Sequence, residues 1–396
     1  MSEAKTATSA RDVSRMKFLS LAVVLGLHAV TVHAADYLPP AGGEWASQAP
    51  EKAGFDPAKL QAAIDFAIAQ ETPAPRDLGL AMALNFAREP YDAQIGPLEP
   101  RGAPTGLVIR HGHLVAQWGE PDRADMTFSV TKSFLSTLVG IALDRGMIRN
   151  IDDAVRGYMP AGPFESEHNR PITWNQMLRQ TSNWQGTLWG KPDWTDRPTG
   201  DNPLAWPTLP VAAPGAAWEY NDVRVNLLAL AALNVWKEPL PEVLKREVMN
   251  PIGASTTWHW EGYENSWVEI DGKRMHSVPG GGHWGGGMFI NAWDQARFGL
   301  LCLHRGKWAG RQIYSEKWYR FASTPTDVQP SYGVMNWFLN TGRKPVPAAP
   351  ADVIMHVGNG ANMLYVDPAH DLVVVVRWIK DDQRPEFIAR LLAALR

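Results

Sequence analysis

The apolar and polar positions near the start of the chain predict a helix followed by a hairpin. Apolar residues three and four apart form one face of residues 57–70, and Asp56 followed by Pro57 is typical of a helix N-terminus. In residues 105–119 two apolar runs surround a glycine, as they do in a β-hairpin. The first third of the chain therefore contributes both a helix and a pair of strands.

The same pattern returns at the other end of the chain. A second hairpin is predicted in residues 361–378, with Asp367 and Pro368 as its turn. Residues 373–376 are four consecutive valines, so this strand is expected to be covered on both faces. PEFIARLLAAL, residues 385–395, predicts a closing helix. Strands near both ends indicate a single antiparallel sheet assembled from the two ends of the chain.

The middle of the chain has a different composition. Long apolar helical runs alternate there with loops rich in proline, glycine and tryptophan. We therefore predict an α/β (α+β) fold in which an antiparallel sheet is flanked by helices. The sheet part would comprise about residues 36–128 and 285–396, and a mostly helical region, about residues 129–284, would be inserted into it.

The N-terminal segment is typical of a secretory signal peptide. In residues 16–35 a cationic start precedes an apolar run, and small residues follow at Ala34 and Ala35. The run is shorter than the roughly 20 residues that span a bilayer. We expect residues 1–35 to be removed, with Met1 or Met16 as the true start. The remaining domain, residues 36–396, would be periplasmic or secreted, without stable membrane insertion.

Charge and cysteine content exclude some classes of function. The chain carries 38 basic and 41 acidic residues, so it lacks the basic excess with which proteins bind nucleic acid. Cys302 is the single cysteine, so no intrachain disulfide can form. Its apolar surroundings favour a buried structural residue over a catalytic thiol.

Ser129 and Lys132, in SVTK at the start of an apolar helical run, are candidates for nucleophilic catalysis. A serine hydroxyl needs a nearby base, and a lysine one helical turn away would lie beside it. That lysine must be neutral, which burial or the positive end of the helix would favour. The helix end also directs N–H groups toward a developing oxyanion. The spacing alone also fits a helix cap beside a solvated lysine.

Two later stretches complete a catalytic pattern. Tyr220 stands just before another apolar helix, where its phenol could exchange a proton with Lys132. His356, Val357 and Gly358 begin a predicted strand and are followed by Asn359, whose N–H could complete an oxyanion hole.

With these landmarks the chain resembles the serine beta-lactamase and penicillin-recognising superfamily over roughly residues 50–395. The resemblance is closest to its class C-like branch, which includes family VIII carboxylesterases and D-amino-acid peptidases. LDRGMIRNIDDAVRGYMP, ITWNQMLRQTSN and WGGGMFINAWDQARFGLL resemble blocks between the family's motifs. The resemblance implies that Ser129 is acylated, that Lys132 and Tyr220 transfer protons, and that the Ser129 and Asn359 amides hold the oxyanion.

Two positions depart from the beta-lactamase pattern. Asp222 stands where those enzymes usually have an asparagine, and an ionised carboxylate cannot donate to an amide carbonyl. It could hold Lys132 or meet a substrate amine. His356 replaces the lysine of the K-T-G motif, and a histidine is mostly neutral near pH 7. We expect Asp222, His356 and Gly358 to contact substrate, with weaker capture of a carboxylate.

We expect neither a cofactor nor a metal. His276 and His283 lie near one another in the sequence but have no acidic or cysteine partners at ligand spacing. The tryptophan-rich loop in residues 184–206 could border the pocket or simply pack onto the helical region.

The sequence thus predicts an exported serine hydrolase that forms a Ser129 acyl-enzyme, with a carboxylic ester as the favoured small-molecule substrate. An amide, lactam or D-peptide substrate is the alternative within this chemistry. A covalent penicillin-binding or sensor protein with slow deacylation is an alternative of another class. Oligomeric state and natural substrate do not follow from these patterns.

Overall fold

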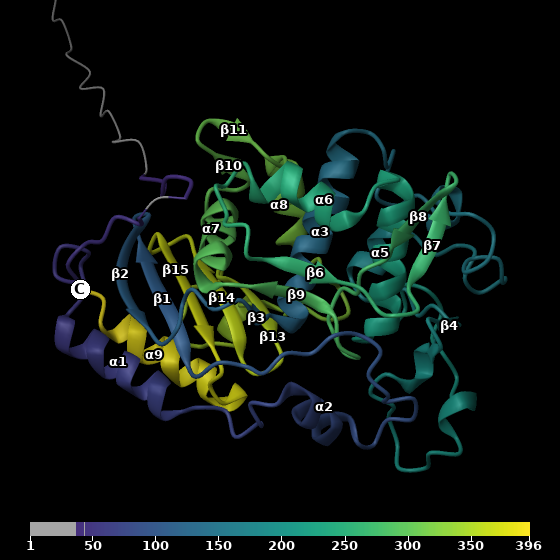
Figure 1. Ribbon diagram of the computed structural model, residues 1–396, viewed down its shortest axis with the longest axis horizontal. Coiled ribbons are helices and arrows are strands. Elements are labelled where there is room, and N and C mark those ends of the chain that lie inside the picture. The colour runs from purple at the N-terminus through teal and green to yellow at the C-terminus, as the bar shows by residue number, and fades with distance from the viewer. Residues whose placement is uncertain (1–36, 43) are drawn as a thin grey trace, which may run out of the picture. The chain divides into compact units, whose positions relative to one another are not determined.

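A six-stranded antiparallel sheet forms the centre of the computed structural model, which describes residues 37–42 and 44–396 (Figure 1). The predicted signal peptide lies outside the described residues. The strand order is β12-β13-β14-β15-β1-β2. The strands are β1 Thr105–Arg110, β2 His113–Trp118, β12 Phe338–Leu339, β13 Ile354–Gly358, β14 Asn362–Asp367 and β15 Leu372–Arg377. Because β15 pairs with β1, the two ends of the chain meet in the middle of the sheet, as predicted.

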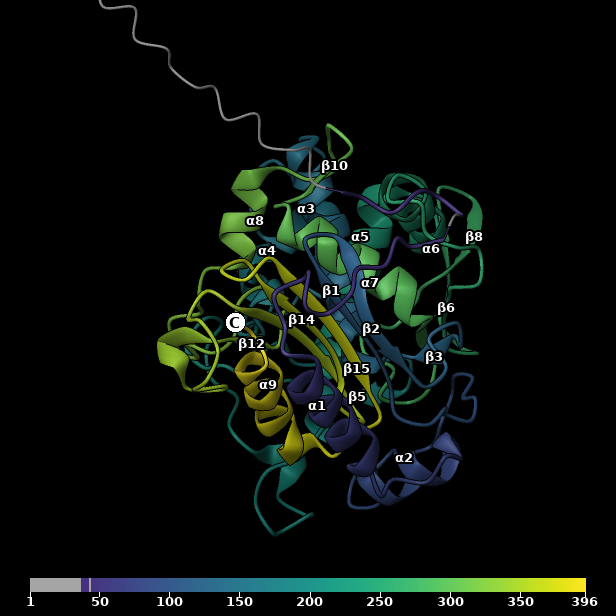
Figure 2. The same cartoon turned by 90° about the vertical axis from the view of Figure 1, so that its left-hand side faces the viewer.

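Helices cover both faces of this sheet. Val374 and Val376 share a hydrophobic cluster with α1 (Pro57–Ala69) and α9 (Arg384–Ala393), which pack side by side. Val373 and Val375 point to the opposite face and pack in a second hydrophobic cluster, which includes residues of α7 (Ala292–Leu303). Figures 1 and 2 show α1 and α9 on one side of the sheet and α7 on the other. The prediction of a strand covered on both faces is confirmed.

The helical region lies beside the edge of the sheet at which β12 and β13 stand. Its main helices are α3 (Thr131–Asp144) and α5 (Asp222–Trp236), which contact one another. It also contains short strands that the apolar pattern did not predict. The remaining helices are α2 Leu78–Phe86, α4 Trp174–Leu178, α6 Leu240–Leu244 and α8 Glu316–Ala322. The remaining strands are β3 Asp125–Met126, β4 Thr187–Leu188, β5 Lys191–Pro192, β6 His259–Glu261, β7 Trp267–Ile270, β8 Lys273–His276, β9 Gly287–Ile290, β10 Lys307–Trp308 and β11 Arg311–Gln312.

Helix α3 begins close to β13 in space, although β13 comes much later in the chain, and α3 extends from there into the helical region. A single turn of 3-10 helix, η1 (Phe128–Val130), precedes it and lies against β13. Residues from Tyr37 onward form one compact unit, so sheet and helical region share their cores. Among the residues described, the structure contains no helix with the length and apolar character needed to span a bilayer.

Candidate active site

The turn that carries Ser129 is fixed from both sides. Thr127 donates its N–H to the Met288 carbonyl at 2.8 Å, which ties the turn to β9. Phe128 has φ of 49°, a left-handed conformation that costs a non-glycine residue about 1 kcal/mol or more. The buried Phe128 ring anchors this conformation, and the half-buried Ser129 reaches a cleft at the protein surface. Backbone strain therefore occurs next to the proposed nucleophile.

Ser129, Lys132 and Tyr220 meet as the sequence predicts. Lys132 Nζ lies 2.9 Å from Ser129 Oγ, and Tyr220 donates its hydroxyl to the same oxygen at 2.6 Å. Tyr220 comes just before α5, whose N-terminus is capped by Asn221. The nucleophile thus contacts two groups capable of proton transfer, one from α3 and one from the segment that leads into α5.

Gly358 lets β13 approach the nucleophile turn. A methyl group at this position would overlap the Thr127 carbonyl oxygen and crowd the Ser129 nitrogen. Without a side chain, Gly358 lies in the wall of the cleft beside Asn359. Both residues therefore lie where the predicted oxyanion hole requires them, whereas the role of the two amides stays a prediction.

The cleft has a volume of about 370 Å³ and combines aromatic with cationic side chains. Trp337 stacks on Tyr220 with ring centroids 4.4 Å apart, and Phe338 stacks on Trp337 at 5.0 Å. Arg197 and Arg384 also lie in its wall. An apolar or aromatic group could thus stack beside the nucleophile, within reach of positive charge.

Lys132 is buried together with Asp222. Nζ contacts Asp222 Oδ1, and Arg197 Nη1 lies 3.0 Å from Asp222 Oδ2. Burial lowers the pKa of the Lys132 ammonium, although the charge of Asp222 acts in the opposite direction. Burial alone would raise the pKa of Asp222, but the charges of Lys132 and Arg197 outweigh it and hold that pKa well below its ordinary value. Asp222 is therefore ionised, and Lys132 is the group whose proton can move.

Tyr220 keeps its proton. Burial, reinforced by the charge of Asp222, raises the pKa of this phenol well above its usual value. The hydroxyl therefore serves as a donor to Ser129.

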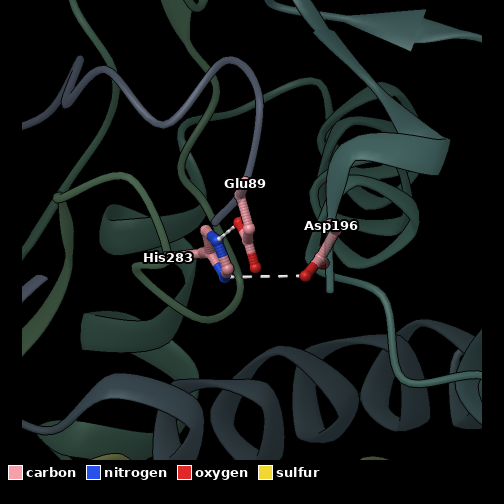
Figure 3. A group of neighbouring side chains, drawn as sticks. All are labelled: Glu89, Asp196 and His283. Atoms are coloured by element: carbon pink, nitrogen blue, oxygen red, sulfur yellow. Dashed lines mark hydrogen bonds and ion pairs between the residues drawn. The ribbon is translucent and has the colours of Figure 1, made fainter. Parts of the chain in front are cut away.

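A second buried cluster lies behind Asp222. Glu89, Asp196 and His283 converge there from three distant parts of the chain (Figure 3). His283 Nε2 lies 2.6 Å from Glu89 Oε2, and Nδ1 lies 3.6 Å from Asp196 Oδ1. The three side chains offer ligand atoms within 4.8 Å of one another, a spacing that could hold a metal ion. Arg197 already brings positive charge to Asp196, which it contacts through Nη1.

Asp222 and His356 do not lie in the wall of the cleft, and their contact with substrate stays a prediction. Asp222 takes the other role that the sequence left open, because it holds Lys132. His356 is buried, with Nδ1 2.7 Å from Ser133 Oγ, and burial lowers its pKa to about 4. A neutral, buried imidazole cannot capture a substrate carboxylate.

The tryptophan-rich loop borders the cleft through Arg197, but none of the tryptophans of this loop lies in the wall. Trp184 and Trp206 are buried; Trp184 packs in the core of the helical region, and Trp206 lies against Arg88. The aromatic wall comes instead from Trp337 and Phe338, at the start of β12.

The beta-lactamase family model matches residues 106–395, which include the nucleophile turn, Tyr220 and β13. The chain belongs to the beta-lactamase family. Its mixed architecture, an antiparallel sheet flanked by helices, is the fold of this family. The assignment does not single out the class C-like branch, which stays an expectation. No curated protein matches the chain.

Solved structures share the fold of this beta-lactamase family member at low sequence identity. A penicillin-binding protein homologue from Caulobacter crescentus is 16% identical, with a TM-score of 0.56 over 86% of this chain and 99% of its own. EstCE1, described as a hydrolase with promiscuous acyltransferase activity, is 15% identical with a TM-score of 0.54, over 85% and 98%. A D-stereospecific amidohydrolase from a Streptomyces species is 16% identical with a TM-score of 0.51, over 84% and 97%.

Sequence patterns missed the residues that surround Lys132 in this family member. Glu89, Asp196 and Arg197 are far from the catalytic motifs in the chain, and no local spacing links them to His283. His283 stands among six glycines in residues 276–287, which is a weak signal that the backbone approaches another group closely there. Gly281 does so, because a methyl group on it would overlap both Lys132 Nζ and Asp222 Oδ1.

Proposed function

We propose that the protein hydrolyses carboxylic esters through an acyl-enzyme on Ser129. The observation that carries this proposal is the approach of both Lys132 and Tyr220 to a single serine oxygen in an open cleft. Lys132 takes the hydroxyl proton while Ser129 Oγ attacks the carbonyl carbon, and the proton returns to the departing alcohol through the Lys132 and Tyr220 pair. Water then attacks the acyl group and releases the acid and free Ser129.

Esters are favoured over lactams because the groups typical of lactam recognition are absent from the cleft wall. The carboxylate of Asp222 cannot donate to a lactam side-chain carbonyl and is engaged by Lys132. His356 is neutral and buried where those enzymes have a lysine. The stacked rings of Trp337 and Phe338 fit an apolar or aromatic acyl or alcohol group.

Purified protein without residues 1–35, assayed on a short-chain nitrophenyl ester and on a chromogenic cephalosporin, tests the substrate class. We expect rapid ester turnover and little cephalosporin turnover. Ser129→Ala should abolish ester turnover, whereas Ser136→Ala, the same exchange in the helix that follows, should retain it. The hydroxyl of Ser136 donates only within α3. Cephalosporin turnover without ester hydrolysis would contradict the ester proposal, and a long-lived adduct without turnover would favour a sensor.

Export belongs to the same proposal, because residues 16–35 have the pattern of a signal peptide. N-terminal sequencing of the protein recovered from a periplasmic or culture fraction should show a start near Ala35 or Asp36. An intact N-terminus in a cytosolic fraction would contradict export.

A further inference from the structure

The two oxygens of Asp222 face different partners, Lys132 on one side and Arg197 with His283 on the other. Oδ1 contacts Lys132 Nζ. Oδ2 lies 3.0 Å from Arg197 Nη1 and 3.5 Å from His283 Nδ1. The charge that Asp222 directs at Lys132 therefore depends on how strongly Arg197 and His283 hold its other oxygen.

Both nitrogens of His283 face carboxylates. Nε2 is 2.6 Å from Glu89 Oε2, whereas Nδ1 lies between Asp196 and Asp222. A neutral imidazole carries one N–H, so one nitrogen lone pair would point at an anion that can only accept hydrogen bonds. The imidazolium presents an N–H on both sides. The side chain is fully buried, so water cannot relieve the repulsion.

The positive charges among these six side chains equal the negative charges only when His283 is protonated. Three carboxylates, Glu89, Asp196 and Asp222, are buried there, and Arg197 and Lys132 supply two positive charges. The groups that face His283 come from four segments: Glu89 after α2, Asp196 and Arg197 after η3 (Asp193–Thr195), Asp222 at the start of α5, and through it Lys132 of α3. The rings of Phe86 and Trp284 cover the imidazole, and Lys191 lies near enough to Glu89 to respond to its charge.

We propose that His283 is a positioning residue that acts as an imidazolium: it holds Asp222 and Asp196, and so allows Lys132 to release its proton to become the base. This inference rests on the proposed function, because Lys132 is the base only if Ser129 is acylated. When His283 is neutral, one carboxylate lacks a counter-charge. Asp222 then stabilises the Lys132 ammonium more strongly.

The direction of the His283 pKa agrees with the geometry. Burial alone would lower this pKa, but the carboxylates of Asp196, Asp222 and Glu89 outweigh burial and raise it. A divalent cation held by Glu89, Asp196 and His283 is the other possible source of the third positive charge. Arg197 favours the proton, because its guanidinium already contacts Asp196 and would repel such an ion.

His283→Gln tests the proposal. The glutamine amide can still donate a hydrogen bond to Glu89. The substitution removes the positive charge of the imidazolium and the N–H that faces Asp222. The measurement is the pH profile of kcat/KM on a nitrophenyl ester, whose acidic limb reports deprotonation of Lys132. We expect this limb to move to higher pH by about one unit, so that activity at pH 7 falls about tenfold. His276→Gln is the matched control, since that half-buried imidazole contacts the Tyr263 carbonyl instead.

Two further measurements complete the test. In ¹⁵N-histidine-labelled wild-type protein, the imidazole in contact with Phe86 and Trp284 should be doubly protonated at pH 8, whether or not the variant folds. A neutral imidazole at that pH, or a folded His283→Gln protein with an unshifted profile, would overturn the inference. So would loss of activity with EDTA that zinc restores. If Ser129 is never acylated in the wild-type protein, the proposed function fails instead.

Discussion

At the scale of single residues, the proposed chemistry depends on one serine oxygen that two other groups approach. Ser129 Oγ receives the Tyr220 hydroxyl at 2.6 Å and lies 2.9 Å from Lys132 Nζ. Each of these groups is poised by its surroundings, since burial favours a neutral lysine and a protonated phenol. The three residues can therefore move a proton without help from solvent.

Lys132→Ala and Tyr220→Phe should each slow acylation of Ser129 by about two to four orders of magnitude, the usual scale of proton-transfer catalysis. Stopped-flow measurement with an ester probe checks this. Tyr332→Phe is the matched control, since that ring lies 6.5 Å from Tyr220 and its hydroxyl faces Met335 Sδ. Acylation at the wild-type rate in both catalytic variants would show that the base is another group.

Gly281→Ala should reduce kcat/KM by about a hundredfold or more, because the methyl group would push Lys132 away from Asp222 and Ser129. Ester turnover and the circular dichroism spectrum should be measured together. Gly157→Ala is the control, since a methyl group there meets nothing within 4 Å. Full activity of the Gly281→Ala protein would mean that the Lys132 contacts are not needed.

At the scale of secondary-structure elements, the pattern of the sequence predicts the sheet and its helices well. Asp56 begins α1 because its carboxylate accepts from the Ala58 and Lys59 amides, both at 3.1 Å. The valine run of β15 is covered on both faces, as its lack of alternation predicts. Local patterns predict these elements because the forces that form them, capping and burial, act within a few residues.

Asp56→Ala should lower the free energy of unfolding by about 1 kcal/mol, since the first amides of α1 lose their acceptor. Urea denaturation checks this, and ester turnover should be unchanged. Asp65→Ala, an exposed aspartate within the same helix, should cost clearly less. Equal losses in the two variants would contradict the capping role.

The sequence predicted the residues of the candidate site less completely than it predicted the helices and strands. Ser129, Lys132 and Tyr220 were found because each stands at the start of a helix in a motif. Glu89, Asp196 and Arg197 lie in loops whose partners are distant in sequence, so only the folded chain brings them to Asp222. The burial of Asp222 and His356 was not foreseen, because a motif position does not reveal which way a side chain is buried.

At the scale of the whole molecule, the two chain ends form the sheet and the middle forms the helical region, so the site stands where the two parts meet. Lys132 comes from α3, Asp222 from α5 and Gly358 from β13. The site therefore requires the complete fold.

His356 should make the protein less stable in mild acid. Its pKa of about 4 lies below that of the unfolded chain, near 6.5. Its contribution to stability is thus fully present above pH 6.5 and is lost as pH falls toward 4. The loss should be on the order of 3 kcal/mol. Thermal unfolding between pH 7 and pH 4 measures it, and His356→Asn should show a flatter dependence. An equally steep fall in that variant would exclude His356 as the cause.

The most direct test of the central claim is the mass of the protein during turnover of a slowly hydrolysed ester. We expect an increase equal to the acyl group, mapped to the peptide that contains Ser129, that appears and decays at rates consistent with turnover. Ser129→Ala should show no adduct. Hydrolysis without any acylated protein, or an acyl group on another residue, would contradict the account.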